Sequence, residues 1–202
     1  MCPPEEYFTA FFKWIGARYG DWELPLAFFL LKSVCGCRLK DICSLEADQW
    51  DGERIHFRGD QTKNRAPRNF LVPKEVATAM TKVKGNVHLW DRYPEGIKSY
   101  LIKNKMKASR VAAEFSPQTF ISFVASVMKR WQAENPSKTL STHDFRKRAV
   151  TVNYEKGMSI SEIADTFGMS EQNVTKSYLD KKRKKVPDHL FQKAGAALMP
   201  SL

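Results

Sequence analysis

The sequence has few cysteines, and their arrangement excludes two classes of protein. The 202 residues include Cys2, Cys35, Cys37 and Cys43. A secreted disulfide scaffold would be shorter and richer in cysteine. The Cys-x-Cys-x5-Cys spacing matches none of the common zinc patterns, and no histidine lies beside it at ligand spacing. We therefore expect reduced thiols that serve as small core residues, and neither a metal nor another cofactor.

Long apolar runs and targeting segments are also missing. The first six residues contain no basic segment and no long apolar segment, so no secretory signal is visible. The most apolar stretch, residues 24–34, contains Lys32 and is too short to span a bilayer. It is expected to form a buried helix. We find no internal repeat. The reduced thiols expected above indicate a reducing cytosol, so we expect a cytoplasmic protein with no membrane contact.

Basic residues, by contrast, are in excess. Lys and Arg number 33 against 22 Asp and Glu, which gives a net charge of +11 and a pI near 9.5. Such an excess favours a polyanionic partner, and nucleic acid is the usual one. With 43% hydrophobic residues, the chain can bury a core of one domain, with or without appendages.

Hydrophobic periodicity predicts a mainly α fold with a small antiparallel β-sheet (α+β). Helices are expected over residues 5–19, 25–34, 73–84, 116–135, 142–157, 160–167, 170–179 and 187–198. Two short β-rich segments, 54–58 and 69–72, predict a hairpin or a three-stranded sheet. Lys63 falls in the turn chemistry between them. Arg38 is expected at the start of a short helix, and Thr142 can cap the helix that carries His143 and Arg146.

Apolar stripes support the first and the fourth of these helices. Both repeat at the spacing of one helix face. The stripe residues are Phe8, Phe11, Phe12 and Ile15 in the first helix, and Phe120, Phe123, Val124 and Val127 in the fourth.

Four short motifs follow one another along the chain, and each alone has an ordinary explanation. Arg38 could be a surface residue or could pair with Asp41 one turn on. Lys63 could be a solvated lysine of a polar turn. His143 and Arg146, at i and i+3, share a helix face, as many such pairs do. Tyr178 could be an ordinary core or surface aromatic residue.

Taken together, the motifs resemble the catalytic domain of the tyrosine recombinases, the phage integrase family. The resemblance covers about residues 5–180. Its motifs read Gly36-Cys-Arg38-Leu-Lys-Asp41-Ile-Cys-Ser-Leu45, Thr62-Lys63-Asn-Arg65 with Leu71-Val-Pro73, His143-Asp-Phe-Arg146, and Phe167-Gly168-Met169 nine steps before Tyr178.

The resemblance implies the DNA breaking-rejoining fold and a metal-independent reaction. Arg38 and Arg146 would hold the non-bridging phosphate oxygens, which the guanidinium fork matches. Lys63 would protonate the departing 5′ oxygen, and His143 would act as a base or as a hydrogen-bond donor. Tyr178 would form a 3′-phosphotyrosine, which a 5′-hydroxyl then resolves. Asp41 and Met169 would be supporting residues.

Two departures from the family pattern stand out. Met169 occupies a position where the family usually has histidine and sometimes tryptophan, a residue that helps to orient the phosphate. The N-terminal core-binding domain of the family is expected to be absent from this chain.

The family comparison also predicts domain organisation and partners. Residues 1–180 would form the catalytic domain, and residues 181–202 a basic linker with a C-terminal helix exchanged between protomers. The partner would be double-stranded DNA in the nucleoid, bound by a homotetramer, with a monomer in isolation. The expected DNA-binding residues are Arg65, Lys147, Lys176, Lys181, Lys182 and Arg183.

Two alternatives remain open. Residues 161–174 also fit a helix-turn-helix pattern, with Gly168 in the turn and Val174 on the core side of a recognition helix. That pattern would indicate a transcriptional regulator rather than an enzyme. The other alternative is a recombinase-like DNA binder whose activity is impaired by Met169.

Overall fold

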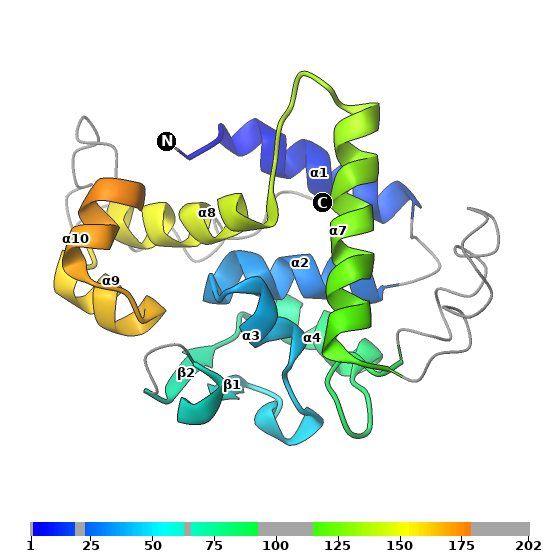
Figure 1. Ribbon diagram of the computed structural model, residues 1–202, viewed down its shortest axis with the longest axis horizontal. Coiled ribbons are helices and arrows are strands. Elements are labelled where there is room, and N and C mark those ends of the chain that lie inside the picture. Colours follow the sequence, from blue (N-terminus) through cyan, green and yellow to red (C-terminus); the bar gives the residue numbers. More distant parts are fainter. Residues whose placement is uncertain (1, 19–22, 63–65, 93–114, 179–202) are drawn as a thin grey trace.

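The computed structural model describes residues 2–18, 23–62, 66–92 and 115–178 (Figure 1). The helices are α1 (Glu5–Arg18), α2 (Leu24–Cys35), α3 (Leu39–Cys43), α4 (Lys74–Val83), α7 (Pro117–Glu134), α8 (Thr142–Glu155), α9 (Ile160–Phe167) and α10 (Glu171–Asn173). The strands are β1 (Arg54–Phe57) and β2 (Arg68–Leu71). Short 3-10 turns lie at Ala47–Gln49 and Gly59–Gln61, and Val174–Tyr178 forms a π-helical turn. The predicted mainly helical fold with a small antiparallel sheet is confirmed.

Helix α2 lies at the centre of the fold and contacts α1, α4 and α8. Ten of its twelve residues are buried, as its apolar sequence predicts. Pro25 suits its first turn, where the ring removes only a donor that the helix leaves unpaired. Gly36 ends it with φ 55° and donates its N–H to the Lys32 carbonyl. No helix in the described part of the chain is both long enough and apolar enough to cross a membrane.

An aromatic cluster joins α1, α2, α7 and α8. Phe11 of α1 lies at its centre, with its ring centroid 4.8 Å from Phe29, 5.4 Å from Trp131 and 5.2 Å from Phe145. All four side chains are fully buried. The apolar stripes predicted for α1 and α7 form part of this core. The cluster fixes α8 through Phe145, which is the immediate neighbour of Arg146.

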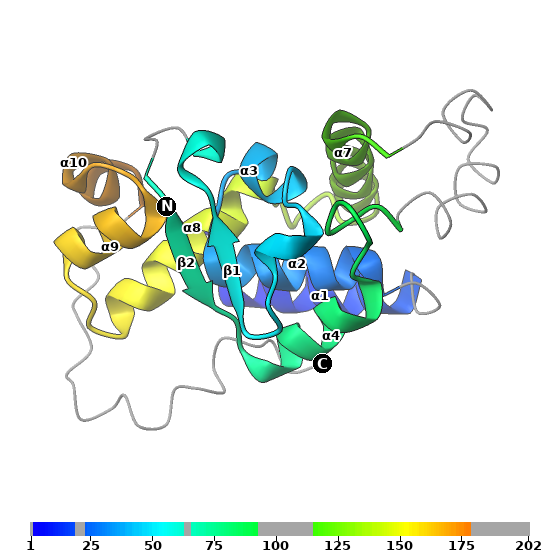
Figure 2. The same cartoon turned by 90° about the horizontal axis from the view of Figure 1, so that it is seen from below.

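The two strands form an antiparallel hairpin on the side of α2 opposite α1 (Figure 1 and Figure 2). In its register, Ile55 is opposite Phe70 and Phe57 is opposite Arg68, and all four residues are buried. The described residues thus give a two-stranded sheet. The turn residues 63–65, including Lys63 and Arg65, lie outside the described residues.

One helix start and one helix length differ from the sequence prediction. Ser141, not Thr142, is the N-cap of α8, because its backbone N–H and its hydroxyl both donate to the Asp144 carboxylate, at 2.8 and 2.7 Å. Of the described residues 170–178 of the next predicted helix, Glu171–Asn173 are α-helical, and Ser170 is the N-cap. The wider π turn that follows carries Tyr178.

Three of the cysteines are small core residues, as predicted. Cys35, Cys37 and Cys43 are fully buried free thiols, and Cys2 is partly exposed. Burial raises the pKa of Cys37 well above its usual range and that of Cys43 to about 12. Both groups are therefore neutral thiols at physiological pH.

Candidate active site

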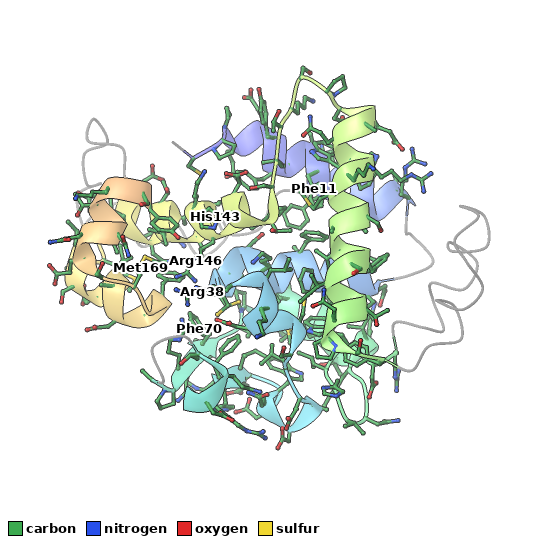
Figure 3. All side chains as sticks on the ribbon, in the orientation of Figure 1. Phe11, Arg38, Phe70, His143, Arg146 and Met169 are labelled. Atoms are coloured by element: carbon green, nitrogen blue, oxygen red, sulfur yellow. The ribbon has the colours of Figure 1, made fainter. Side chains whose placement is uncertain are left out.

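The first turns of α8 carry two of the predicted site residues. The cap formed by Ser141 and Asp144 fixes where the helix begins. Phe145 packs into the aromatic core, and His143 and Arg146, at i and i+3, share another face of the helix. Figure 3 shows both residues in the region where α8, α9 and the start of α3 meet.

Arg146 connects three segments of the chain. It is 3% exposed. Its Nη1 donates to the Gly36 carbonyl at 2.8 Å, and its Nη2 donates to the Phe167 carbonyl at 2.8 Å. Its Nε donates to the Tyr178 hydroxyl at 3.3 Å. A guanidinium has five N–H donors, so this arrangement leaves donors for a further acceptor.

Tyr178 lies between the two residues of α8. Its ring centroid is 5.6 Å from that of His143 and 5.9 Å from the Arg146 guanidinium carbon. The Tyr178 carbonyl accepts a hydrogen bond from the Thr151 hydroxyl at 3.4 Å. The π turn therefore presents the phenol to α8 while its backbone is anchored one turn further along the same helix.

Burial lowers the pKa of His143 below its usual value, and the charges of Lys147 and Arg146 lower it further. The imidazole is consequently neutral at pH 7. A neutral imidazole beside a phenol can accept its proton.

Arg38 is placed by the turn that links α2 to α3. The turn needs glycine at position 36, since a Cβ there would come within 2.8 Å of the Phe167 ring and 2.9 Å of the Ala149 Cβ. Arg38 follows as the N-cap of α3, with an extended backbone. Its Nη1 is buried and has no hydrogen-bond partner within the described part of the chain. A buried, unpaired guanidinium nitrogen is suited to bind an anion.

One interpretation of the sequence was that Asp41 pairs with Arg38, but in the structure Asp41 pairs with Arg68 instead. Its Oδ2 lies 3.6 Å from Nη2 of Arg68, and both side chains are buried. Arg68 also donates from Nη1 to the Phe167 carbonyl at 2.9 Å. The same carbonyl thus accepts from both Arg68 and Arg146.

Sequence reasoning missed two buried basic residues at this site. Arg68 could have been noticed, because strand alternation places it on the same face as Phe70. Lys32 is 1% exposed, and its Nζ donates to the Cys37 carbonyl at 2.7 Å. This hydrogen bond stabilises the turn before Arg38. Burial lowers the pKa of Lys32. The presence of a lysine in an apolar helix was the available signal.

Met169 lies at the start of the segment that leads to Tyr178. Its backbone N–H donates to the Ala164 carbonyl at 2.9 Å, and its partly buried side chain packs against the core. A thioether cannot donate a hydrogen bond to a phosphate. The structure therefore places an apolar group where the family pattern has a donor.

Of the remaining predicted residues, Lys147 lies close to His143, and most of the others lie outside the described residues. Lys147 pairs with Asp144 at 2.9 Å, and Lys176 is exposed on the π turn. Lys63, Arg65, Lys181, Lys182, Arg183 and the predicted C-terminal helix belong to the undescribed segments. Across the described residues, no group of three or more His, Cys, Asp or Glu side chains is arranged to hold a metal ion.

Comparison with known proteins identifies a family. A sequence model described as "Phage integrase family" matches residues 24–185. The fold is similar to that of a solved structure, "Crystal structure of XerA recombinase", with a TM-score of 0.60 and 15% sequence identity. The match covers 88% of this chain and 58% of that chain, so this chain spans little more than half the length of that protein. No curated protein sequence matches.

Proposed function

The chain belongs to the phage integrase family, and we propose that it is the catalytic domain of a site-specific DNA recombinase with Tyr178 as the nucleophile. The observation that carries the proposal is the contact between Arg146 and Tyr178. A buried guanidinium that donates to the phenol at 3.3 Å would bind a phosphate next to the attacking oxygen.

The first chemical step uses the cluster of side chains around Tyr178. The phenol oxygen attacks the phosphorus, and its proton passes to the neutral His143 imidazole. Arg146 and the unpaired Nη1 of Arg38 stabilise the charge that builds up on the non-bridging oxygens. The bond from phosphorus to the 5′ oxygen breaks, and a 3′-phosphotyrosine remains.

The leaving group also needs a proton. Lys63, which lies between the two strands in the sequence, is proposed to protonate the departing 5′ oxygen. The 5′-hydroxyl of a second DNA end then attacks the phosphotyrosine and releases Tyr178. Because the arginines supply the positive charge, the proposed reaction needs no metal ion.

DNA binding is proposed to involve six further basic residues of the chain. They are Arg65, Lys147, Lys176, Lys181, Lys182 and Arg183. The chain is further proposed to work as a tetramer on DNA, with its C-terminal helix exchanged between protomers. The location would be the cytoplasm, in association with the nucleoid.

The decisive experiment is a covalent trap. Nicked suicide duplexes with randomised flanking sequence are incubated with the chain, and DNA that stays attached to protein in SDS is recovered and sequenced. We expect enrichment with the wild type and none with Tyr178→Phe, and we expect trapping to persist in EDTA. Absence of trapped DNA from the wild type, or equal trapping by Tyr178→Phe, would refute the proposed function.

Alternatives give different results in the same experiment. A helix-turn-helix regulator or an impaired recombinase would bind selected duplexes without any covalent product. The position of Tyr178 argues against the regulator, because the phenol contacts Arg146 and the second helix of the motif has only three α-helical residues. The trap distinguishes the proposed function from both alternatives without knowledge of the target sequence.

A further inference from the structure

We propose that Arg68 is a positioning residue that ties the tyrosine segment, residues 168–178, to the β-hairpin. The proposal deepens the recombinase function proposed above and rests on it. Arg68 does not contact the tyrosine itself. Its effect would pass through the backbone at the end of α9, ahead of the tyrosine segment.

The contacts of Arg68 join three elements. From β2, its Nη1 donates to the carbonyl of Phe167, the last residue of α9, at 2.9 Å. Its Nη2 lies 3.6 Å from the Asp41 carboxylate of α3. Its guanidinium carbon lies 5.9 Å from the Phe57 ring centroid across the hairpin. At 8% exposure, the side chain has little freedom to leave these partners.

The backbone beside Arg68 is shaped to receive it. Gly168 has φ 59°, a conformation that favours glycine, and it caps α9. A Cβ at this position would come within 2.8 Å of Nη1 and 3.1 Å of Cζ of Arg68. The guanidinium thus lies directly against the peptide that begins the tyrosine segment.

The shared carbonyl links Arg68 to the reacting groups. The Phe167 oxygen accepts from Arg68 and from Arg146, and Arg146 also donates to the Tyr178 hydroxyl. The guanidinium groups of Arg68 and Arg146 therefore both lie at the C-terminal end of α9, where the helix dipole is negative. The Asp41 carboxylate lies on the other side of the Arg68 guanidinium and offsets part of this charge.

This arrangement couples the two ends of the proposed reaction. Lys63, the proposed proton donor to the leaving oxygen, precedes Arg68 of β2 by five positions in the sequence. Tyr178, the proposed nucleophile, follows Phe167 in the tyrosine segment. In-line displacement requires nucleophile and leaving-group acid on opposite sides of one phosphorus. Arg68 bonds to the end of α9 beside the ring of Phe70, whose centroid lies 6.1 Å from that of Phe167, and it thereby holds the tyrosine segment in place relative to β2.

The test compares Arg68→Met and Arg68→Lys with the wild type. Single-turnover cleavage is measured at saturating concentrations of a duplex enriched by the covalent trap, together with its Kd. We expect Arg68→Met to cleave about 10- to 100-fold more slowly with an unchanged Kd, as for loss of a charged hydrogen bond. Arg68→Lys should recover part of the rate, because it keeps the charge opposite Asp41 but cannot bridge both acceptors.

A second readout needs no DNA. Amide hydrogen exchange is measured in the free protein, with helix α7 as the internal reference. Arg68→Met should accelerate exchange in the tyrosine segment and leave α7 unchanged. Gly168→Ala should also accelerate exchange there, because it strains the backbone at φ 59° and also pushes against the guanidinium. If Arg68→Met does not fold, both the cleavage rate and the amide exchange are measured on Arg68→Lys instead.

Arg148→Met is the matched control. Arg148 is also buried, at 1% exposure, and it binds Glu5 of α1 away from the tyrosine segment. It should lower the Tm without selective exchange in residues 168–178.

Three results would overturn the proposal: wild-type cleavage by Arg68→Met, a loss confined to Kd, or unchanged exchange in the tyrosine segment. If the wild type itself traps no DNA, the recombinase function fails, and hydrogen exchange alone then decides the positioning role.

Discussion

Replacement of Arg146 by lysine tests whether one side chain both supports the fold and binds the phosphate. Lysine keeps the positive charge, but its single ammonium cannot serve the Gly36 carbonyl, the Phe167 carbonyl and the Tyr178 hydroxyl together. Because Phe167 keeps its bond to Arg68, the substitution leaves the Gly36 carbonyl as the main buried acceptor at risk.

The magnitude follows from that count of acceptors. One orphaned buried carbonyl costs about 1–3 kcal/mol of unfolding free energy. At 3% exposure, little of this cost is relieved by water. The loss of a fixed phosphate clamp should slow cleavage by about 100- to 1,000-fold.

Urea denaturation and the covalent trap, run on the same preparations, measure both effects. Tyr178→Phe is the matched variant, since it removes only the 3.3 Å contact to Arg146. It should abolish trapping while changing stability by less than about 1 kcal/mol. If the Arg146→Lys variant is destabilised but cleaves at the wild-type rate, Arg146 supports the fold and does not stabilise the phosphate. Unchanged stability would contradict the proposed importance of its carbonyl contacts.

Three further predictions address single positions. Met169→His should cleave DNA as fast as the wild type or faster, because histidine supplies a hydrogen-bond donor that the thioether lacks. A large loss of trapped DNA would instead indicate a specific role for Met169. As the pH is lowered, the cleavage rate should stay constant until the pH is below about 6.5, because burial lowers the pKa of His143 and the neutral imidazole is the proposed base. A pH–rate profile whose midpoint lies well above that value would contradict this prediction. His56 lies 2.8 Å from Asp51 and 3.0 Å from the Asn69 side-chain oxygen, and the bond to Asp51 is the main cause that raises the pKa of His56. The contribution of His56 to the free energy of unfolding should therefore be complete below pH about 6.5 and be lost as the pH rises through the higher pKa of the folded state. Urea titrations at several pH values should show this loss in the wild type and not in His56→Gln.

Much of the fold follows from local patterns in the sequence. Phe8, Phe11 and Phe12 recur at helical spacing, so their burial could be predicted before their partners were known. The order of the motifs brought Arg38, His143, Arg146 and Tyr178 into one hypothesis, and the structure gathers the last three in direct contact.

Features that depend on distant contacts could not be predicted in this way. Arg68 donates to the carbonyl of Phe167, which is 99 positions away in the sequence. No local sequence pattern predicts a contact between residues so far apart. The π turn at Tyr178 has the same polar composition as an ordinary helix end. Thr142 and Ser141 are both good capping residues, and only the bonds of Asp144 to Ser141 decide between them.

The burial of three thiols has a practical consequence for studying this protein on DNA. Cys35, Cys37 and Cys43 are inaccessible in the folded chain, whereas Cys2 is partly exposed just ahead of α1. A maleimide dye applied under native conditions should therefore attach at Cys2 alone. The natural sequence then provides a single fluorescent reporter, with no engineered cysteine, for counting how many copies of the chain assemble on one DNA molecule.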